Sequence, residues 1–294
     1  MPEAAAAVRP PVPVIDLHVH IQPWEEMRPE ARAKIGKDPA EQAALAALMR
    51  RPDEILARMD RAGVERIAMI NYVAPDLMGF TAAVNYFVAG IARHAPDRLI
   101  PFGGVHPRHV DDPGGEVERL RELGIRGLKV HPPHQEHAAN AYLFDLPGLG
   151  RVYETAQALG MPVMVHTGTS VFPGARNRFA DPMPCDDVAV DFPDLTLILA
   201  HAGRPLYMET CFFLARRHPN VYLDVSGIPP KRLLHYLPRL PEIAEKVLWG
   251  TDWPSPGVRD LGENIADFLA LPLAPEVQRQ VLRGNACRIF GWPP

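Results

Sequence analysis

The alternation of short apolar runs with segments of helical periodicity is the feature that most constrains this 294-residue sequence. Such alternation is typical of βαβ units wound around a parallel sheet. The expected strands are Val14 to His18, Arg66 to Asn71, Leu99 to Val105, Ile125 to Val130, Pro162 to His166, Leu195 to Ala200, Val221 to Val225 and Lys246 to Gly250. Eight strands favour a closed (β/α)8 TIM barrel of the α/β class, with an open doubly wound sheet as the alternative.

Helical patterns fill most intervals between these strands. They are Asp53 to Ala62, Thr81 to His94, Glu116 to Leu123, Leu149 to Leu159, Tyr207 to Arg217 and Glu263 to Ala270. Three of them are followed by a glycine, at Gly63, Gly124 and Gly160, where the left-handed residue that often ends a helix is expected. Since no linker-like segment interrupts the pattern, we expect one domain over residues 14–294, preceded by a flexible tail at residues 1–13.

Two connections are too long to be simple turns. Residues 21–52 follow the first strand, and residues 167–184 follow the fifth. Long loops in compact domains are commonly lids or binding loops, and loops that follow strands lie at the catalytic face of a barrel. We therefore expect Arg176, in the second loop, to contact an anionic substrate. Arg178 and Arg204 suit the same role, while ordinary ion-paired surface arginines are an equally good explanation for all three.

The composition argues against several classes of protein. The 31 basic and 35 acidic residues are mixed along the chain, so no polybasic surface for nucleic acid is expected. No apolar run approaches the roughly 20 residues of a membrane helix, and the first residues lack a signal-peptide pattern. Three cysteines without CxxC spacing fit free thiols in a reducing compartment. We expect a cytoplasmic protein with no membrane partner, and the sequence leaves a homodimer open.

Six of the twelve histidines stand at or just beyond the carboxyl ends of the expected strands, where barrel enzymes place their reactive groups. They are His18, His20, His106, His131, His166 and His201. A single histidine in such a position is most often a hydrogen-bonded structural residue. Six together favour a functional site.

His18 and His20 form the most specific local element. Residues two apart on an extended strand point the same way, so both imidazoles can bind one ion. Asp252 ends the last strand, and barrel closure brings that strand beside the first. The sequence therefore predicts a metal site of His18, His20, His166 and Asp252, with His201 facing the ion across the space for substrate.

Five segments together resemble those of the amidohydrolase superfamily. They are Asp16 to His20, Gly127 to Pro132, Val163 to Gly168, Leu197 to Gly203 and Val247 to Pro254. The resemblance runs from Val14 to Phe290 and is greatest for the amidohydrolase 2 branch, which includes aminocarboxymuconate semialdehyde decarboxylase, aromatic acid decarboxylases, lactonases and other hydrolases.

The resemblance implies that His18, His20 and His166 ligate one divalent ion per chain, with zinc expected and manganese as the alternative. It also implies that Asp252 binds the ion or its water and that His201 acts on the substrate or water. Some members place a carbamylated lysine on the fourth strand to bridge two metals, a position that Lys129 could fill. The Val-His-Pro that follows it is typical of mononuclear relatives, so Lys129 and His131 are expected to contact substrate instead.

The expected activity is metal-dependent hydrolysis of an amide, lactone, ester or activated carbon–carbon bond in a small anionic molecule. The metal would lower the pKa of its water, and Asp252 would accept the proton. A non-oxidative decarboxylase is the alternative within the same branch, with Asp252 or His201 protonating the carbon that loses CO2. A non-catalytic ligand-binding barrel is a third interpretation, disfavoured because the full set of expected ligands is present.

Overall fold

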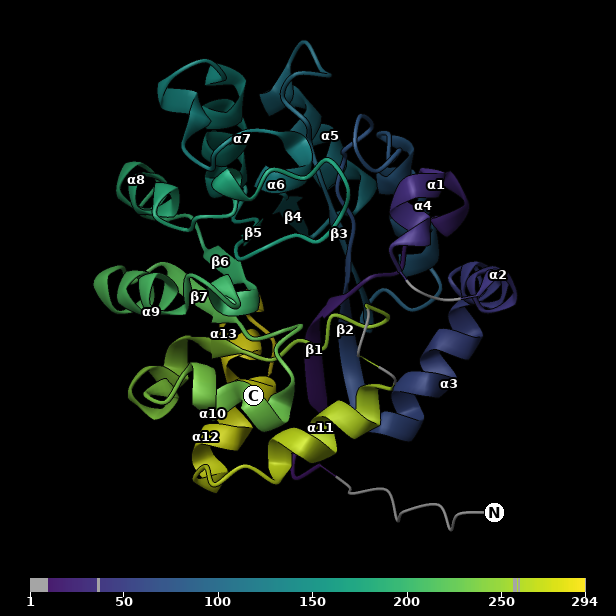
Figure 1. Cartoon of the computed structure of the whole chain (residues 1–294), viewed down its shortest axis with the longest axis vertical. Helices are drawn as coiled ribbons and strands as arrows, with labels where there is room; N and C mark the ends of the chain where they lie inside the picture. Colours follow the sequence, from purple (N-terminus) through teal and green to yellow (C-terminus); the bar gives the residue numbers. More distant parts are fainter. Residues whose placement is uncertain (1–9, 36–37, 256–257, 259, 294) are drawn as a thin grey trace.

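Eight parallel strands form the barrel in this computed structural model, which describes residues 10–35, 38–255, 258 and 260–293. The strands are β1 (Val14–Val19), β2 (Val64–Ile70), β3 (Leu99–Gly103), β4 (Gly127–Val130), β5 (Val163–His166), β6 (Leu197–Ala200), β7 (Val221–Asp224) and β8 (Val247–Leu248). Each strand pairs with the next along the chain, and the helices surround them (Figure 1). The prediction of a (β/α)8 barrel is confirmed.

Main-chain contacts between the end of β8 and β1 close the barrel. The Leu17 N–H donates to the carbonyl of Trp249 at 2.9 Å, and the Asp252 N–H donates to the carbonyl of His18 at 2.8 Å. Val19 and Trp253 form a further parallel bridge. Because these bonds join segments more than 200 residues apart in sequence, they fix the last strand's carboxylate beside the first strand's histidines.

The helices have the following bounds. The α-helices are α1 (Pro29–Ala33), α2 (Pro39–Leu48), α3 (Pro52–Ala62), α4 (Ala83–Ala92), α5 (Pro113–Leu123), α6 (Pro132–Gln135), α7 (Pro147–Ala158), α8 (Pro184–Asp191), α9 (Met208–Arg217), α10 (Leu233–Tyr236), α11 (Leu261–Leu269), α12 (Pro275–Arg279) and α13 (Asn285–Phe290). Short 3-10 turns are η1 (Trp24–Glu26), η2 (Ala141–Leu143), η3 (Asn177–Phe179), η4 (His201–Gly203), η5 (Pro230–Arg232) and η6 (Leu240–Lys246), and η7 (Gln280–Gly284) is a π-helix.

Proline and glycine mark the ends of these helices. Eight of the α-helices in the described chain begin with proline, whose fixed φ suits the first helical position and whose missing N–H has no partner to lose there. Gly63 and Gly124 end α3 and α5 with left-handed φ values of 71° and 101°, and Gly160 follows α7 with φ 61°. The predicted helix ends are confirmed at all three glycines.

Apolar side chains form one cluster inside the barrel and a larger one between the barrel and the helices. Phe102 fills the interior so tightly that a Cβ at Gly127 would lie 2.4 Å from its ring. The strands are buried on both faces, which explains why they read as continuous apolar runs. Close packing inside the barrel leaves the carboxyl-terminal mouth as the place for a cavity.

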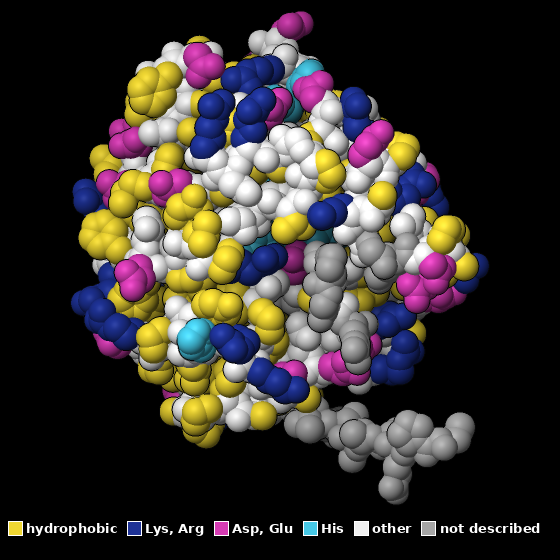
Figure 2. Space-filling model, viewed as in Figure 1, with side chains coloured by type: hydrophobic (Ala, Val, Ile, Leu, Met, Phe, Trp, Pro, Cys, Tyr) yellow, Lys and Arg dark blue, Asp and Glu magenta, His cyan; other side chains and the backbone are white. Residues whose placement is uncertain are grey.

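The two long connections fold over this mouth. Residues 21–52 contain η1, α1 and α2, and residues 167–184 contain η3. Figure 2 shows histidine and acidic side chains at the bottom of a hollow near the centre of this face, beside a basic one. None of the helices in the described ranges is both long and apolar enough to span a bilayer. Residues 1–9 of the expected flexible tail lie outside the described residues.

Candidate active site

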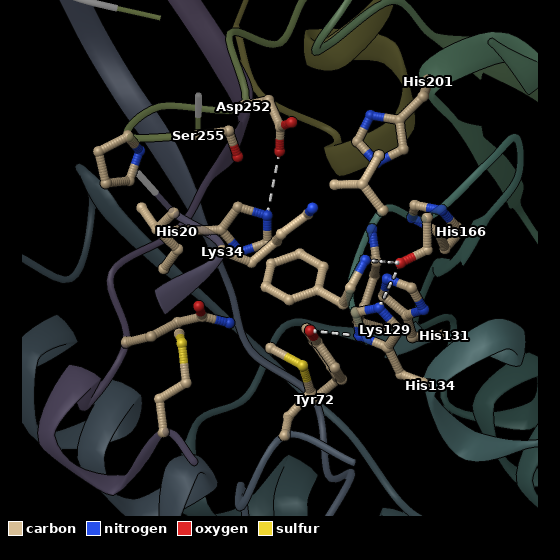
Figure 3. A pocket seen from close by; sticks show the side chains of 18 of the residues that line it. His20, Lys34, Tyr72, Lys129, His131, His134, His166, His201, Asp252 and Ser255 are labelled. Carbon is tan, nitrogen blue, oxygen red and sulfur yellow. Dashed lines mark hydrogen bonds and ion pairs between the residues drawn. The ribbon is translucent and has the colours of Figure 1, made fainter. Parts of the chain in front are cut away.

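A cavity of about 280 Å³ opens at the carboxyl ends of the strands (Figure 3). Its polar lining includes His20, Lys129, His131, His166, His201 and Asp252. Its apolar lining includes Trp24, Met27, Ile35, Met78 and Phe172. Since an engineered cavity of about 150 Å³ holds benzene, this space suits a single substituted six-membered ring.

The structure brings His18, His20 and Asp252 together, as the sequence predicted. One ligand atom from each lies within 4.8 Å of the others. Asp252 Oδ1 is 3.0 Å from His20 Nε2 and 3.6 Å from His18 Nε2. Ligand atoms around a tetrahedral zinc ion are separated by about 3.3 Å, given bonds of about 2.0–2.1 Å. The three side chains can therefore share one ion with little rearrangement.

A buried carboxylate forms a hydrogen bond with the His18 ring nitrogen that points away from Asp252. His18 Nδ1 is 2.5 Å from Asp224 Oδ2, and Ser226 Oγ donates to the same oxygen at 2.7 Å. Burial raises the pKa of Asp224 to about 6, so the group is ionised at neutral pH and accepts the Nδ1 proton. The free Nε2 of His18 then faces Asp252 as an unprotonated ligand. This carboxylate–imidazole pair is the arrangement that orients histidines in metal sites.

His166 reaches the same cavity from the end of β5. Its Nε2 is buried and has no hydrogen-bond partner among the described residues, which is costly unless a ligand occupies it. It lies outside the 4.8 Å group of His18, His20 and Asp252, so its ligation remains a prediction. Three imidazoles and one carboxylate form a suitable donor set for a divalent transition metal.

His201 is close to His18 rather than across a substrate-sized space from it. Their ring centroids are 4.8 Å apart. Ser226, which follows β7, lies between them, and its Oγ is 3.0 Å from the Nδ1 atom of each ring. His201 Nδ1 donates to the carbonyl of Ser226 at 3.1 Å, which leaves Nε2 as the unprotonated nitrogen. Burial, followed by the neighbouring His166 and His18, holds the pKa of His201 well below its usual range, so the ring is neutral.

Two of these residues adopt backbone conformations that side chains rarely occupy. His201 has φ 64° and Asp252 has φ 68°, both in the left-handed region. Such conformations persist where the surrounding contacts determine them and are common at active sites. Gly227 allows a further close approach, since a Cβ there would lie 2.7 Å from Arg204 Nη2 and 2.9 Å from Asp252 Oδ2.

Asp252 is poised to act as a base. Burial tends to raise the pKa of its carboxyl, but the His20 contact and the nearby His18 and Arg204 outweigh burial and lower it overall. Arg204 Nη2 lies 3.6 Å from Asp252 Oδ2, and Arg204 Nε is buried without a hydrogen-bond partner in the described chain. The site thus combines an ionised carboxylate with an adjacent guanidinium from a residue that lines the cavity.

The family model described as Amidohydrolase matches residues 15–292. The chain belongs to the amidohydrolase family. It is 25% identical over 266 residues to a 4-sulfomuconolactone hydrolase of Rhizobium radiobacter, covering 81% of this chain and 80% of that one. It is 31% identical over 146 residues to a 2-pyrone-4,6-dicarboxylate hydrolase of Comamonas testosteroni, covering 36% of this chain and 47% of the relative.

The amidohydrolase also resembles solved structures across nearly its whole length. A 5-carboxyvanillate decarboxylase from Novosphingobium aromaticivorans, complexed with manganese, superposes with a TM-score of 0.69 at 15% identity and covers 98% of this chain and 100% of its own. These findings identify an enzyme of the branch that contains metal-dependent hydrolases and decarboxylases. A divalent metal at the His18–His20–Asp252 group agrees with both the family and the geometry.

Lys129 and His131 of the amidohydrolase lie where substrate contacts were expected, at the cavity. Lys129 is completely buried, which lowers the pKa of its amine to about 8, and its Nζ is 3.4 Å from His18 Nε2. His131 is stacked between His134 and His166, with ring centroids 3.5 Å and 3.9 Å away. Their contact with substrate, and the alternative of a lysine-bridged second metal, remain predictions.

Several polar residues around the cavity of this amidohydrolase were not singled out in the sequence. Tyr72 Oη and His134 Nδ1 are hydrogen bonded at 2.9 Å, and His134 Nε2 and Ser170 Oγ at 2.8 Å, forming a buried polar chain beside the cavity. Asp224 and Ser226 support His18, as described above. One sequence feature could have identified Asp224 as a site residue. It is an aspartate at the end of an apolar strand, as is Asp252.

Arg176 and His106 lie away from the amidohydrolase cavity. Arg176 does not line it, has a side chain that is 60% exposed and pairs with Glu136 at 3.3 Å. Of the three arginines considered in the sequence, only Arg204 lines this cavity, so the geometry gives the expected substrate contact at Arg176 no support. His106, one of the six strand-end histidines, lines a separate cavity with His109.

Proposed function

We propose that this enzyme hydrolyses the ester bond of a small anionic lactone. The observation that carries the proposal is the position of Asp252, whose carboxylate lies between the His18–His20 pair and the guanidinium of Arg204. A base therefore stands between a metal site and an anion-binding group. The two sequence relatives named above act on a muconolactone and a pyrone dicarboxylate, and both substrates are ring compounds with acidic substituents.

The residues of the site have complementary tasks in such a reaction. A bound divalent ion would supply Lewis acidity that lowers the pKa of water and polarises the lactone carbonyl. Asp252, which is ionised at neutral pH, would accept the proton that water loses and return it to the ring oxygen as the acyl C–O bond breaks. His201 is neutral with a free Nε2, so it accepts a hydrogen bond from water and positions it, and does not donate to the carbonyl.

Arg204 would orient the substrate. The guanidinium of Arg204, a residue that lines the cavity, suits a carboxylate or sulfonate substituent, which a guanidinium binds in a planar, charge-assisted geometry. Phe172 and Met78 also line the cavity and would contact the faces of an unsaturated ring. The cavity thus holds the ring by apolar contact and its charge by Arg204, leaving the acyl carbon near Asp252.

An isotope experiment distinguishes hydrolysis from decarboxylation, which the family also contains. Unsaturated six-membered lactones with one or two carboxylates, and hydroxybenzoates as the comparison, are incubated with enzyme in H2(18)O. Hydrolysis places one 18O in the product carboxylate and releases no CO2. Release of CO2, with solvent deuterium on the product carbon in D2O, would establish the decarboxylase instead and overturn the proposal.

The proposed metal is one zinc ion per chain, because three imidazoles and one carboxylate suit zinc, and expansion to five-coordination would admit water or substrate. Elemental analysis of the purified protein, with reconstitution of the apoprotein by zinc or manganese, decides between the two metals. A cytoplasmic location also belongs to this proposal. It is supported by the three cysteines of the chain, Cys185, Cys211 and Cys287, all of which are free thiols.

A further inference from the structure

A second group of histidines lies at the ends of β2 and β3, outside the active-site cavity. His106 follows β3 and His109 comes three residues later, while Asp76 belongs to the loop after β2. The two strands are neighbours in the barrel, so the segments that follow them meet at the mouth. These three residues line or border a cavity of about 260 Å³ that shares no lining residue with the active-site cavity.

A tight turn sets the two imidazoles beside each other. The His109 N–H donates to the carbonyl of His106 at 2.9 Å, so Pro107 and Arg108 occupy the corner and both rings emerge together. Their ring centroids are 4.5 Å apart, edge to face. His109 Nε2 lies 2.9 Å from Asp76 Oδ2, and one ligand atom from each of the three residues lies within 4.8 Å of the others.

Histidine nitrogens in this group are available as ligands. His106 is 4% exposed, and burial, helped by His137 and His109, lowers its pKa to about 4, so the ring is neutral. Its Nδ1 accepts a weak hydrogen bond from the backbone N–H of Arg108 at 3.4 Å. His137 is 2% exposed and donates Nδ1–H to the carbonyl of Ala138, which leaves its buried Nε2 without a partner.

The charges around the group do not oppose a cation. Arg108 is the nearby positive charge, but it is directed toward Asp145 at 3.3 Å and toward the carbonyl of Glu136 at 3.3 Å. Glu116 lines the cavity and adds negative charge, although Arg119 pairs with it. The ring of His137 is 6.0 Å from that of His106, so a further neutral imidazole adjoins the group.

We propose that Asp76, His106 and His109 form a second metal site, separate from the catalytic one, that binds a divalent transition ion such as Zn²⁺. Two imidazoles and one carboxylate favour such an ion over Mg²⁺ or Ca²⁺, which prefer oxygen ligands. Three protein ligands leave at least one coordination position open toward the cavity. Binding would replace the hydrogen bond between His109 and Asp76 and would link the loop after β2 to the turn after β3.

Metal stoichiometry tests the site. The holoenzyme, with its active-site metal loaded and quantified, is titrated with Zn²⁺ by calorimetry, and the bound metal is counted after equilibrium dialysis. The variants are Asp76→Asn and His109→Asn, both at exposed positions that should not disturb folding, with side chains 65% and 39% exposed. His94→Asn, an exposed histidine after α4, is the matched control.

We expect the wild type and His94→Asn to bind one equivalent of zinc beyond the active-site metal. Each of the other two variants should weaken this second equivalent by about tenfold or more, since a three-ligand site is reduced to two. Turnover and the active-site metal should be unchanged in both. The proposal is overturned if saturating zinc adds no second equivalent to the wild type, or if both variants retain it with the affinity of the His94→Asn control.

Discussion

The two histidine groups at the barrel mouth, around His18 and around His109, differ in the burial of the carboxylate that pairs with an imidazole ring. In the active site, His18 is completely buried and is held at Nδ1 by the equally buried Asp224. In the group after β3, His109 pairs with Asp76, whose side chain is 65% exposed. A carboxylate shielded from water fixes one tautomer and one ring orientation, whereas an exposed carboxylate exchanges its partner with solvent. The two groups contain similar numbers of histidines, so the difference between them lies in whether a buried carboxylate fixes the ring of a histidine.

Replacing one metal-ligating histidine in each group should give the largest difference in turnover. His18→Ala should lose the active-site metal and lower kcat/KM by roughly 10³-fold or more, because metal activation supplies several kcal/mol of transition-state stabilisation. His109→Ala should leave turnover unchanged. Elemental analysis and steady-state kinetics of both variants measure this, and full activity of metal-free His18→Ala protein would refute the assignment of the catalytic metal.

A smaller effect is expected from His201, which contacts the active-site group without being needed to hold the ion. His201→Asn should keep most of the metal and lower kcat by about a hundredfold, the scale of loss when a reacting group is misplaced by about 1 Å. Metal content and kcat are measured on the same preparation. Loss of the metal would make His201 a ligand and favour a second ion bridged by Lys129, whereas retention of both metal and activity would make it structural.

The supporting carboxylate tests the comparison directly. Asp224→Asn keeps the shape of the side chain but removes the charge behind His18, so the affinity for the active-site metal should fall by about 10- to 100-fold. Asp76→Asn is the matched change at the exposed group and should leave that affinity unaltered. Competition with a chelator gives both values. Equal affinities in the two variants would show that Asp224 does not orient His18.

The smallest effect concerns the two loop arginines. Arg204→Met should raise KM about tenfold for an anionic substrate, as expected for a charge-assisted hydrogen bond at a partly exposed group. Arg176→Met should leave KM unchanged, because Arg176 pairs with Glu136 on the surface. Kinetics with charged and uncharged lactones sharpen the result, since the effect of Arg204 should vanish for the uncharged compound.

Much of the fold could be predicted because the strands of a closed barrel are buried on both faces. Val163–His166 and Leu197–Ala200 read as apolar runs and formed strands at those positions. The direction of the loop arginines could not be predicted in this way. Position on a loop at the catalytic face says nothing about which way a side chain points, so Arg176 was expected at the cavity while the structure directs Arg204 there.

By itself the sequence determined the barrel and the local pair of His18 and His20, because strand periodicity and residue spacing are properties of adjacent residues. Only the tertiary structure decided that Asp224, 206 residues from His18, supports its ring, and that His106 belongs to a separate cavity. The reason is geometric. Which strand ends converge depends on the closure, twist and loop packing of the whole barrel, and these are set by contacts between residues far apart in the chain.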